Sequence, residues 1–175
     1  QPQRAVWLIR ESSFGGRARQ ASGFERANQP NRPPALLEFF VATRDELCTE
    51  EEVTTLVYDF YDRVRADEAL GPIFNGHIQD WDKHLKRMVQ FWSSMLRGTG
   101  TYSGTPMPVH VALPDLSAEL FQQWLKLFHL TCETLANRPF AEKAEDFAHR
   151  IARSLWYGYQ LYNKPEAAPT EVFNA

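Results

Sequence analysis

The sequence predicts an all-α domain between about residue 41 and residue 164. A helix-capping motif begins at Thr49, apolar residues recur at helical spacing in the stretches that follow, and no stretch alternates polar and apolar residues as a strand does. The chain has 175 residues, a length that suits one ordinary domain with an appendage.

The first predicted helix follows Thr49-Glu50-Glu51-Glu52, which fits a capping box. In this motif the Thr hydroxyl and the last Glu carboxylate each accept a hydrogen bond from the other residue's backbone N–H. The apolar residues that follow share one helix face, because their spacing is i, i+3, i+4, i+7, i+8 and i+11. We expect Gly71-Pro72 to end this unit and residues 72–74 to form a short turn. The apolar face consists of Val53, Leu56, Val57, Phe60, Tyr61 and Val64.

A second helix is predicted from about Asp80 to Leu96, with aromatic and aliphatic residues crowded on one side. A glycine-rich loop then begins at Gly98. Because this loop carries Pro106 and Pro108, we expect no helix to cross it.

Two more helices are predicted in the last third of the chain. The third begins near Ser117, a favourable N-cap residue with Glu119 in the first turn after it. The fourth begins near Phe140 and ends at Lys164-Pro165, since proline cannot continue a helix.

Composition excludes several classes of protein. Hydrophobic residues make up 43% and charged residues 23%, a globular balance, and the net charge of −3 argues against a nucleic-acid-binding domain. Cys48 and Cys132 are too few for a disulfide framework or a zinc finger, and no C-x-x-C-H motif attaches a c-type haem. No apolar run approaches the roughly 18 residues of a membrane span. We therefore expect a cytoplasmic protein without a membrane partner, not a secreted scaffold.

Residues 1–40 differ in charge from the rest of the chain. Six arginines face two glutamates up to residue 35, whereas the remainder holds 13 basic and 20 acidic residues. We predict a flexible, Arg-rich extension, with a transit peptide or a nucleic-acid-binding arm as alternatives. At the other end we expect residues 165–175 to be a frayed tail.

His110 is the residue whose surroundings point most directly to chemistry. It lies between the apolar segments 107–109 and 111–113, where an unpaired buried imidazole nitrogen costs about 1–3 kcal/mol. A metal ion and a loop carbonyl are both suitable partners, so both interpretations stay open. No H-E-x-x-H, G-x-S-x-G or phosphate-binding glycine motif is present. We expect surface or structural roles for His77, His129 and His149.

Five blocks of the sequence resemble group III truncated haemoglobins. They occur in the same order and at compatible intervals, and the likeness runs from about residue 47 to residue 163. The blocks are residues 60–74, Trp81-Asp82-Lys83-His84, Phe91-Trp92, residues 102–114 and residues 121–128.

The resemblance implies a truncated globin fold, a two-on-two helical sandwich around a non-covalently bound haem b. Carried over by position, His110 matches the histidine that ligates the iron, and Tyr61, His84 and Trp124 match residues on the distal, ligand-binding side. His84 either donates to the ligand or swings outward to admit it, and we favour this gate. The implied apolar walls are Phe60, Phe74, Met88, Phe91, Trp92, Leu113 and Phe128, with Trp156 as a further candidate.

Three functions follow from the resemblance. The first is reversible binding of O₂, with NO and CO as rival ligands. The second is an enzyme that converts NO and O₂ to nitrate or reduces peroxide; it requires an external reductase, because we expect no flavin or nicotinamide domain. The third is a helical interaction module that has lost haem, which the intact set of Tyr61, His84, His110 and Trp124 argues against.

Overall fold

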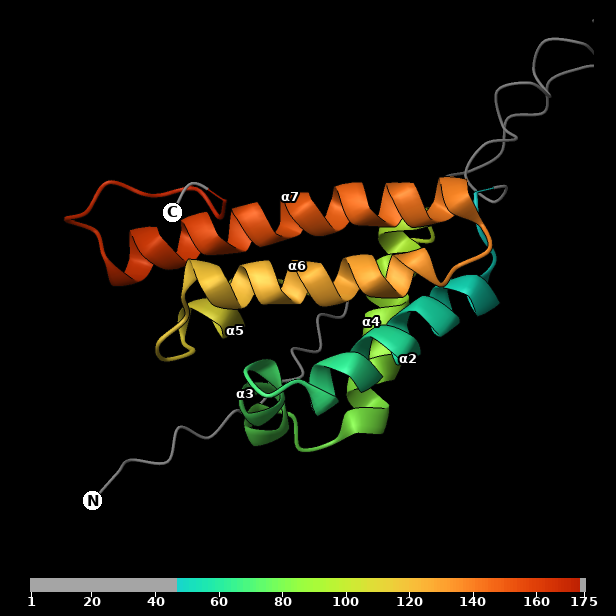
Figure 1. The fold of residues 1–175 in the computed structure, drawn as a ribbon, viewed down its shortest axis with the longest axis horizontal. Helices are drawn as coiled ribbons and strands as arrows, with labels where there is room; N and C mark the ends of the chain where they lie inside the picture. The colour runs from blue at the N-terminus through green and yellow to red at the C-terminus, as the bar shows by residue number, and fades with distance from the viewer. Residues whose placement is uncertain (1–46, 174–175) are drawn as a thin grey trace, which may run out of the picture. The chain divides into compact units, whose positions relative to one another are not determined.

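The structure, a computed structural model, describes residues 47–173, and the regular secondary structure within this range is all helical (Figure 1). This finding confirms the all-α prediction. The predicted extension, residues 1–40, lies outside the described residues. The helices are α2 (Glu50–Ala66), α3 (Leu70–His77), α4 (Trp81–Leu96), α5 (Met107–Val111), α6 (Ala118–Glu133) and α7 (Arg138–Asn163).

Each of the four long helices begins at a side-chain cap. The capping box before α2 is complete: the Thr49 N–H donates to Glu52 Oε2 over 2.7 Å, and the Glu52 N–H donates to Thr49 Oγ1 over 3.2 Å. Asp80, Ser117 and Asn137 each accept the backbone N–H three residues ahead, before α4, α6 and α7 respectively. Each cap pairs an N–H group that has no partner within its helix.

The short turn expected at residues 72–74 is instead part of a helix, α3. Asp67 Oδ1 accepts the N–H groups of Ala69 (3.0 Å) and Leu70 (2.9 Å), so the start of the helix is paired locally. Pro72 falls in the first turn, where its missing N–H removes no helical hydrogen bond. The Gly-Pro pair therefore begins a helix here, which corrects the prediction.

The expectation that no helix forms around Pro106 and Pro108 is also wrong. The five-residue helix α5 spans Met107–Val111, with Pro106 as its N-cap and Pro108 in its first turn. Both prolines sit where a helix tolerates them. His110 is consequently a helical residue, not a loop residue.

The helices pack as two pairs (Figure 1). α6 and α7 lie side by side and run in opposite directions, and α2 packs against both α4 and α6. α4 crosses behind and reaches α7, so the α2–α4 pair covers the α6–α7 pair. This is the two-on-two arrangement that the resemblance implied. α3 packs on α2 and α6, while α5 packs on α7.

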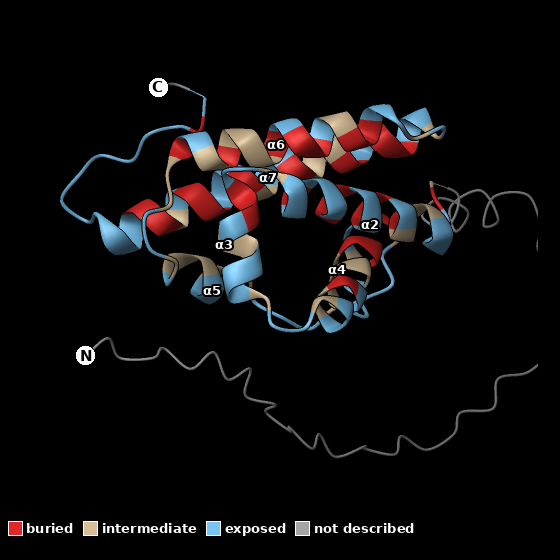
Figure 2. Cartoon of the chain, turned by 60° about the horizontal axis from the view of Figure 1, so that its bottom comes forward, coloured by how far each residue is buried: buried red, intermediate tan, exposed pale blue. Residues whose placement is uncertain are grey.

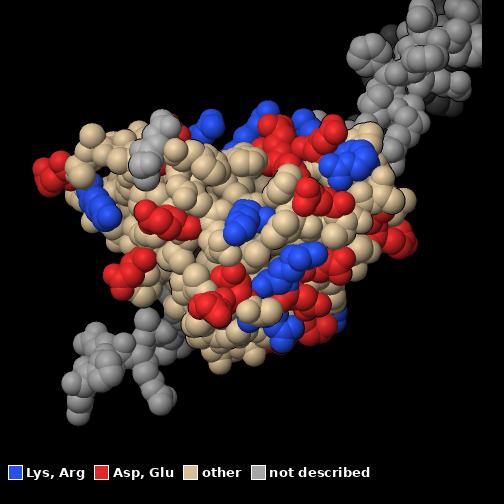
Figure 3. Space-filling view, viewed as in Figure 1, with Lys and Arg blue, Asp and Glu red and all other residues tan. Residues whose placement is uncertain are grey.

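The core lies between the two pairs, where the buried sides of the helices meet (Figure 2). The apolar face predicted for the first helix is buried in full. On the face shown in Figure 3, Lys and Arg side chains are mixed with Asp and Glu over the outer surfaces of the helices. Within the described part of the chain, no helix has both the length and the apolar character needed to traverse a bilayer.

After α7 the chain turns back along the molecule. Gln160 Oε1 accepts the Thr170 N–H (2.8 Å) and hydroxyl (3.0 Å), and Gln160 Nε2 donates to the Thr170 carbonyl (3.0 Å). Gln122 Nε2 donates to the carbonyl of Val172, whose side chain is only 3% exposed. These contacts join residues 170–172 to α6 and α7, while fraying of residues 165–175 in solution stays a prediction.

Candidate functional site

An aromatic cluster surrounds Tyr61, one of the predicted distal residues. Tyr61 is 6% exposed, and its ring centroid lies 5.0 Å from that of Phe60 on the same helix, α2. The rings of Phe74 on α3 and of Trp81 and His84 on α4 lie 6.1, 6.0 and 5.1 Å from it. The fold thus brings Tyr61 and His84 together from separate helices.

The Tyr61 hydroxyl is available as a hydrogen-bond donor. Burial raises the pKa of Tyr61, and the nearby Tyr102 raises it further, so the hydroxyl stays protonated at neutral pH. Among residues 47–173, no hydrogen bond uses this hydroxyl. A ligand that reached this hydroxyl could accept a hydrogen bond from it, in surroundings that are otherwise apolar.

His84 carries a buried nitrogen without a partner. Its Nε2 atom is inaccessible to solvent and makes no hydrogen bond to any described residue. Burial, with the charge of Arg87 as a second cause, lowers the pKa of His84 to about 4, so the ring is neutral at pH 7. Unpaired buried polar atoms are uncommon in native proteins, and this one lies beside Tyr61.

Trp124 on α6 belongs to the same cluster through Phe60. The Phe60 ring lies edge-on to Trp124, with centroids 5.1 Å apart, and also 5.1 Å from Phe128. Trp124 stacks on Phe128 at 5.5 Å with an interplanar angle of 18°. The three predicted distal residues Tyr61, His84 and Trp124 are therefore joined by one continuous set of ring contacts.

Most of the predicted wall residues extend this set of rings. Trp92 stacks on Phe128 at 5.0 Å, and Phe91 lies edge-on to Trp92 at 5.5 Å. Together with Phe60 on α2 and Phe74 on α3, these rings form one continuous aromatic cluster that includes residues of α4 and α6.

Three other wall candidates lie apart from these ring contacts. Met88 is partly buried against the core, whereas Leu113 is partly buried but outside the core cluster. The Trp156 ring contacts Phe121 and Tyr159, each at 5.8 Å. For these three, as for the five aromatic candidates, the role of a haem-contacting wall stays a prediction.

Two neighbours of the cluster were not singled out from the sequence. The guanidinium carbon of Arg87 lies 5.6 Å from the ring centroid of Tyr102, and the Tyr102 backbone N–H is held by Ser94 Oγ at 3.0 Å. The charge of Arg87 contributes to the lowered pKa of His84, and Tyr102 contributes to the raised pKa of Tyr61. Arg87 follows His84 by one helical turn, a spacing that could have revealed it.

His110 is held in one tautomer by its own helix. Its Nδ1 lies 2.8 Å from the Pro106 carbonyl, which can only accept, so Nδ1 carries the hydrogen and Nε2 keeps its lone pair. Burial lowers the pKa of His110, which favours the neutral ring. The sequence left two partners open for His110, a backbone carbonyl and a metal ion. The two are compatible, because the carbonyl binds Nδ1 and Nε2 stays available to a metal. No ring contact within the described residues joins His110 to the Tyr61 cluster.

Comparison with known proteins places this arrangement in a family. The family model for bacterial-like globins matches residues 43–154. The chain belongs to the bacterial-like globin family.

A protein sequence and a solved structure that resemble this globin both come from Campylobacter jejuni. The protein named group 3 truncated hemoglobin ctb is 38% identical over 111 residues, which cover 61% of this chain and 87% of the relative. The crystal structure of a group III truncated hemoglobin from Campylobacter jejuni aligns with a TM-score of 0.61 and 32% identity, over 70% of this chain and 98% of that one. The resemblance to group III truncated haemoglobins is confirmed.

Membership of the family implies that this globin binds haem and takes small gaseous ligands such as O₂. The chemistry of the candidate-site residues fits a bound haem. His110 offers a neutral imidazole whose Nε2 can ligate haem iron, and its Nδ1 partner, a backbone carbonyl, is the usual second contact of such a histidine. The unpaired, buried His84 Nε2 and the protonated Tyr61 hydroxyl are polar groups that a haem-bound ligand could contact.

The three other histidines are exposed. His129 lies between the carboxylates of Glu145 (3.1 Å) and Glu133 (3.6 Å), and the His149 ring contacts Phe173 at 5.6 Å. Within residues 47–173, no group of three His, Cys, Asp or Glu side chains is arranged to hold a metal ion by itself.

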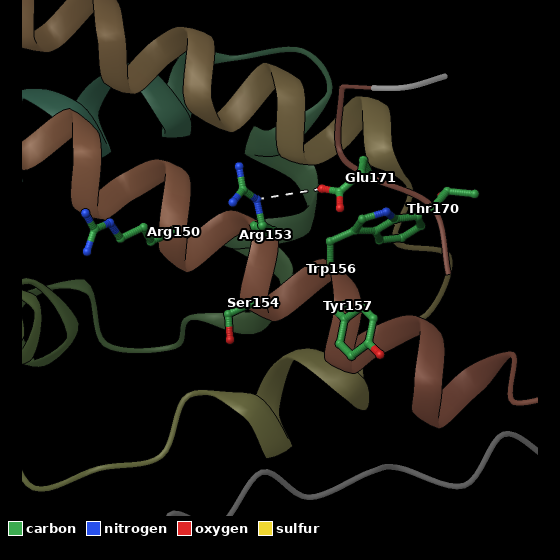
Figure 4. Close-up of a pocket in the computed structure, with 7 residues that line it drawn as sticks. All are labelled: Arg150, Arg153, Ser154, Trp156, Tyr157, Thr170 and Glu171. Atoms are coloured by element: carbon green, nitrogen blue, oxygen red, sulfur yellow. Dashed lines mark ion pairs between the residues drawn. The ribbon is translucent and has the colours of Figure 1, made fainter. Parts of the chain in front are cut away.

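A separate surface hollow lies between α7 and the C-terminal segment (Figure 4). Trp156 lines it together with Arg150 and Arg153. Both arginines already face carboxylates: Arg153 lies 3.7 Å from Glu171, and Arg150 lies 3.0 Å from Asp146. None of the matched distal residues lines this hollow, so the candidate site is the Tyr61 cluster with His110.

Proposed function

We propose that this globin binds dioxygen reversibly at a non-covalently held haem b whose iron is ligated by His110, with NO and CO as competing ligands. The observation that carries the proposal is the fixed tautomer of His110, which leaves Nε2 as the coordinating atom. Haem, when bound, supplies an iron with one coordination position open to a diatomic gas.

The distal residues have distinct roles in this proposal. The Tyr61 hydroxyl and the Trp124 indole N–H donate to the partly negative outer atom of dioxygen, and such charge-assisted bonds are stronger than neutral ones. The apolar rings around them exclude water, which would otherwise compete for the same donors. Trp124 has a donor but no acceptor, so it favours an electron-rich ligand.

His84 serves as a gate in the same proposal. Its ring packs edge-on against Tyr61 and Trp81, and its Nε2 has no protein partner among the described residues, so outward rotation breaks no hydrogen bond. His84→Leu should therefore change the ligand association rate more than the equilibrium affinity. Stopped-flow data with the reverse pattern would exclude the gate.

Conversion of NO and O₂ to nitrate is the second candidate function. The observation that favours it is the pair of uncommitted donors, Tyr61 and Trp124, because donors that hold dioxygen also favour its activation. Each turnover requires one electron from an external reductase. Stopped-flow mixing of the reduced protein with O₂ and then NO, with nitrate measured, separates the two functions.

The iron ligand is tested with His110→Ala. We expect this variant to lose haem and its Soret band, whereas His129→Ala, which alters an exposed histidine, should retain both. Undiminished haem stoichiometry in His110→Ala would refute the assignment. Circular dichroism of the haem-free proteins shows whether both variants fold.

A further inference from the structure

The position of His110 depends on α7. Its helix, α5, has five residues, none of them buried, and among the described helices it packs only against α7. A helix of this length is not stable in isolation. Its place in the fold must therefore be set by tertiary contacts with α7.

One contact is a close approach at the start of α5. The Met107 side chain lies over Gly158 on α7, and a Cβ atom at Gly158 would collide with the Met107 sulfur. The Met107 side chain therefore occupies the space in front of Gly158 and joins the start of α5 to α7.

Two hydrogen bonds follow on the other side of His110. Asn163 Nδ2 donates to the Val111 carbonyl over 2.9 Å, at the end of α5. The Tyr159 hydroxyl accepts the Leu116 N–H over 3.2 Å, in the segment that follows. Tyr159 is only 5% exposed, so little water can replace its hydroxyl as the partner.

Any movement of α5 must also move the His110 imidazole. His110 Nδ1 is bonded to the carbonyl of Pro106, and the His110 carbonyl accepts the Leu113 N–H over 3.1 Å. The ring is thus fixed to the backbone of its own helix, and Nε2 follows any shift of α5.

All three contact residues lie outside the part of the chain that matches the family model. That match ends at residue 154, while the contacts are made by Gly158, Tyr159 and Asn163. Gln160, between them, is bonded to Thr170 in the returning C-terminal segment. The last turns of α7 therefore contact the returning C-terminal segment on one side. On the other side they contact α5 and the segment that follows it.

We propose that Tyr159 and Asn163 are positioning residues that set the placement of the His110 imidazole and so tune its bond to the haem iron. This inference rests on the proposed function, in which His110 is the iron ligand. Residues that orient a metal ligand from the second layer affect the metal bond without touching the metal.

The test compares Tyr159→Phe with Tyr157→Phe in the haem-loaded protein. Tyr157 is its neighbour on α7, is 52% exposed and has no hydrogen-bonded partner among the described residues. We expect Tyr159→Phe to shift the iron–histidine stretching band in the resonance Raman spectrum of the ferrous protein and to accelerate haem release about fivefold. Tyr157→Phe should change neither quantity.

Asn163→Ala provides a second variant and should shift the band in the same way. If the folded variants lose thermal stability while the band stays in place, the two residues are merely structural and the inference is overturned. An equal shift in Tyr157→Phe overturns it too. If the wild-type band persists unchanged in His110→Gly, the proposed function itself fails, which is a distinguishable result.

Discussion

Tyr61 and His84 place two polar groups inside a cluster of aromatic rings, and neither group has a hydrogen-bond partner among residues 47–173. The buried His84 Nε2 would normally find a partner in a folded protein, because an unpaired buried group costs about 1–3 kcal/mol. Their pKa shifts keep the hydroxyl protonated and the imidazole uncharged. At neutral pH both residues are therefore uncharged, and the proposed ligand would meet a hydroxyl donor beside a neutral imidazole.

Tyr61→Phe should accelerate the dissociation of O₂ about tenfold, because a lost donor worth about 1.4 kcal/mol changes an equilibrium by that factor. Trp124→Phe should have an effect of similar size. Stopped-flow displacement of O₂ measures both rates. Tyr58→Phe, which removes a hydroxyl from an exposed position of the same helix, is the control and should leave the rate unchanged. Unchanged rates in the first two variants would place the polar contacts elsewhere.

The pKa of His84 also predicts how the stability of the haem-free protein depends on pH. In the unfolded chain this histidine takes up a proton near its ordinary pKa of 6.5, whereas in the folded chain it does so only at about 4. The unfolded state thus binds more protons between these values, and the free energy of unfolding falls as the pH falls through this window. The lowered pKa of His110 acts in the same direction.

His84→Leu removes one of these contributions. Urea unfolding at about pH 7 and about pH 5 should show a smaller loss of stability in this variant than in the wild type. An equal loss in both proteins would mean that the His84 ring is protonated in the folded state, and hence that it is not held in the buried position.

At the level of helices, the sequence predicts the four long ones and misjudges the two short ones. The long helices carry both a cap and an apolar face, so local and tertiary preferences agree. α3 and α5 have too few residues for a periodic pattern, and their prolines suggest a break. The hydrogen bonds from the start of α3 to the Asp67 carboxylate favour α3, and packing against α7 favours α5.

The cap of α7 should contribute more stability than the cap of α2. Thr49 makes its bonds at an exposed helix end, and Thr49→Ala should cost about 1 kcal/mol. Asn137 accepts the Phe140 N–H over 3.2 Å and donates to the Leu47 carbonyl (2.9 Å) and to Glu52 Oε1 (3.0 Å). It therefore links the starts of two helices as well as capping one of them.

We expect Asn137→Ala to cost about 2 kcal/mol, since a cap and two partly buried hydrogen bonds are lost together. Urea unfolding of the two haem-free variants measures the difference. If Asn137→Ala costs no more than Thr49→Ala, the bonds from Asn137 to Leu47 and Glu52 contribute nothing to stability.

At the level of the whole molecule, the candidate site is assembled from residues that sequence spacing alone could not bring together. Tyr61, His84 and Trp124 come from three helices, and their ring contacts depend on the packing of the α2–α4 pair on α6. The sequence identified them only through a family resemblance. Tyr102 was missed because its effect on Tyr61 arises from proximity in the fold, whereas Arg87 lies one helical turn after His84 and was open to prediction from spacing.

Truncation of the C-terminal segment, residues 165–175, tests where the folded domain ends. The sequence places the domain end at residue 164, but Val172 is buried and the side chains of Gln122 and Gln160 are bonded to the returning chain. A chain that ends at Lys164 should therefore be less stable than the full chain by about 2 kcal/mol, the contribution of a buried valine side chain.

A chain that ends at Phe173 is the matched control and should unfold at the same urea concentration as the full chain. Equal stability of the chain ending at Lys164 would mean that the tail frays in solution, because contacts that are populated only briefly contribute little free energy. If stability instead falls as expected, the returning segment belongs to the domain. Its bonds to Gln160 then support the turns of α7 that carry Tyr159 and Asn163, and through them the placement of His110.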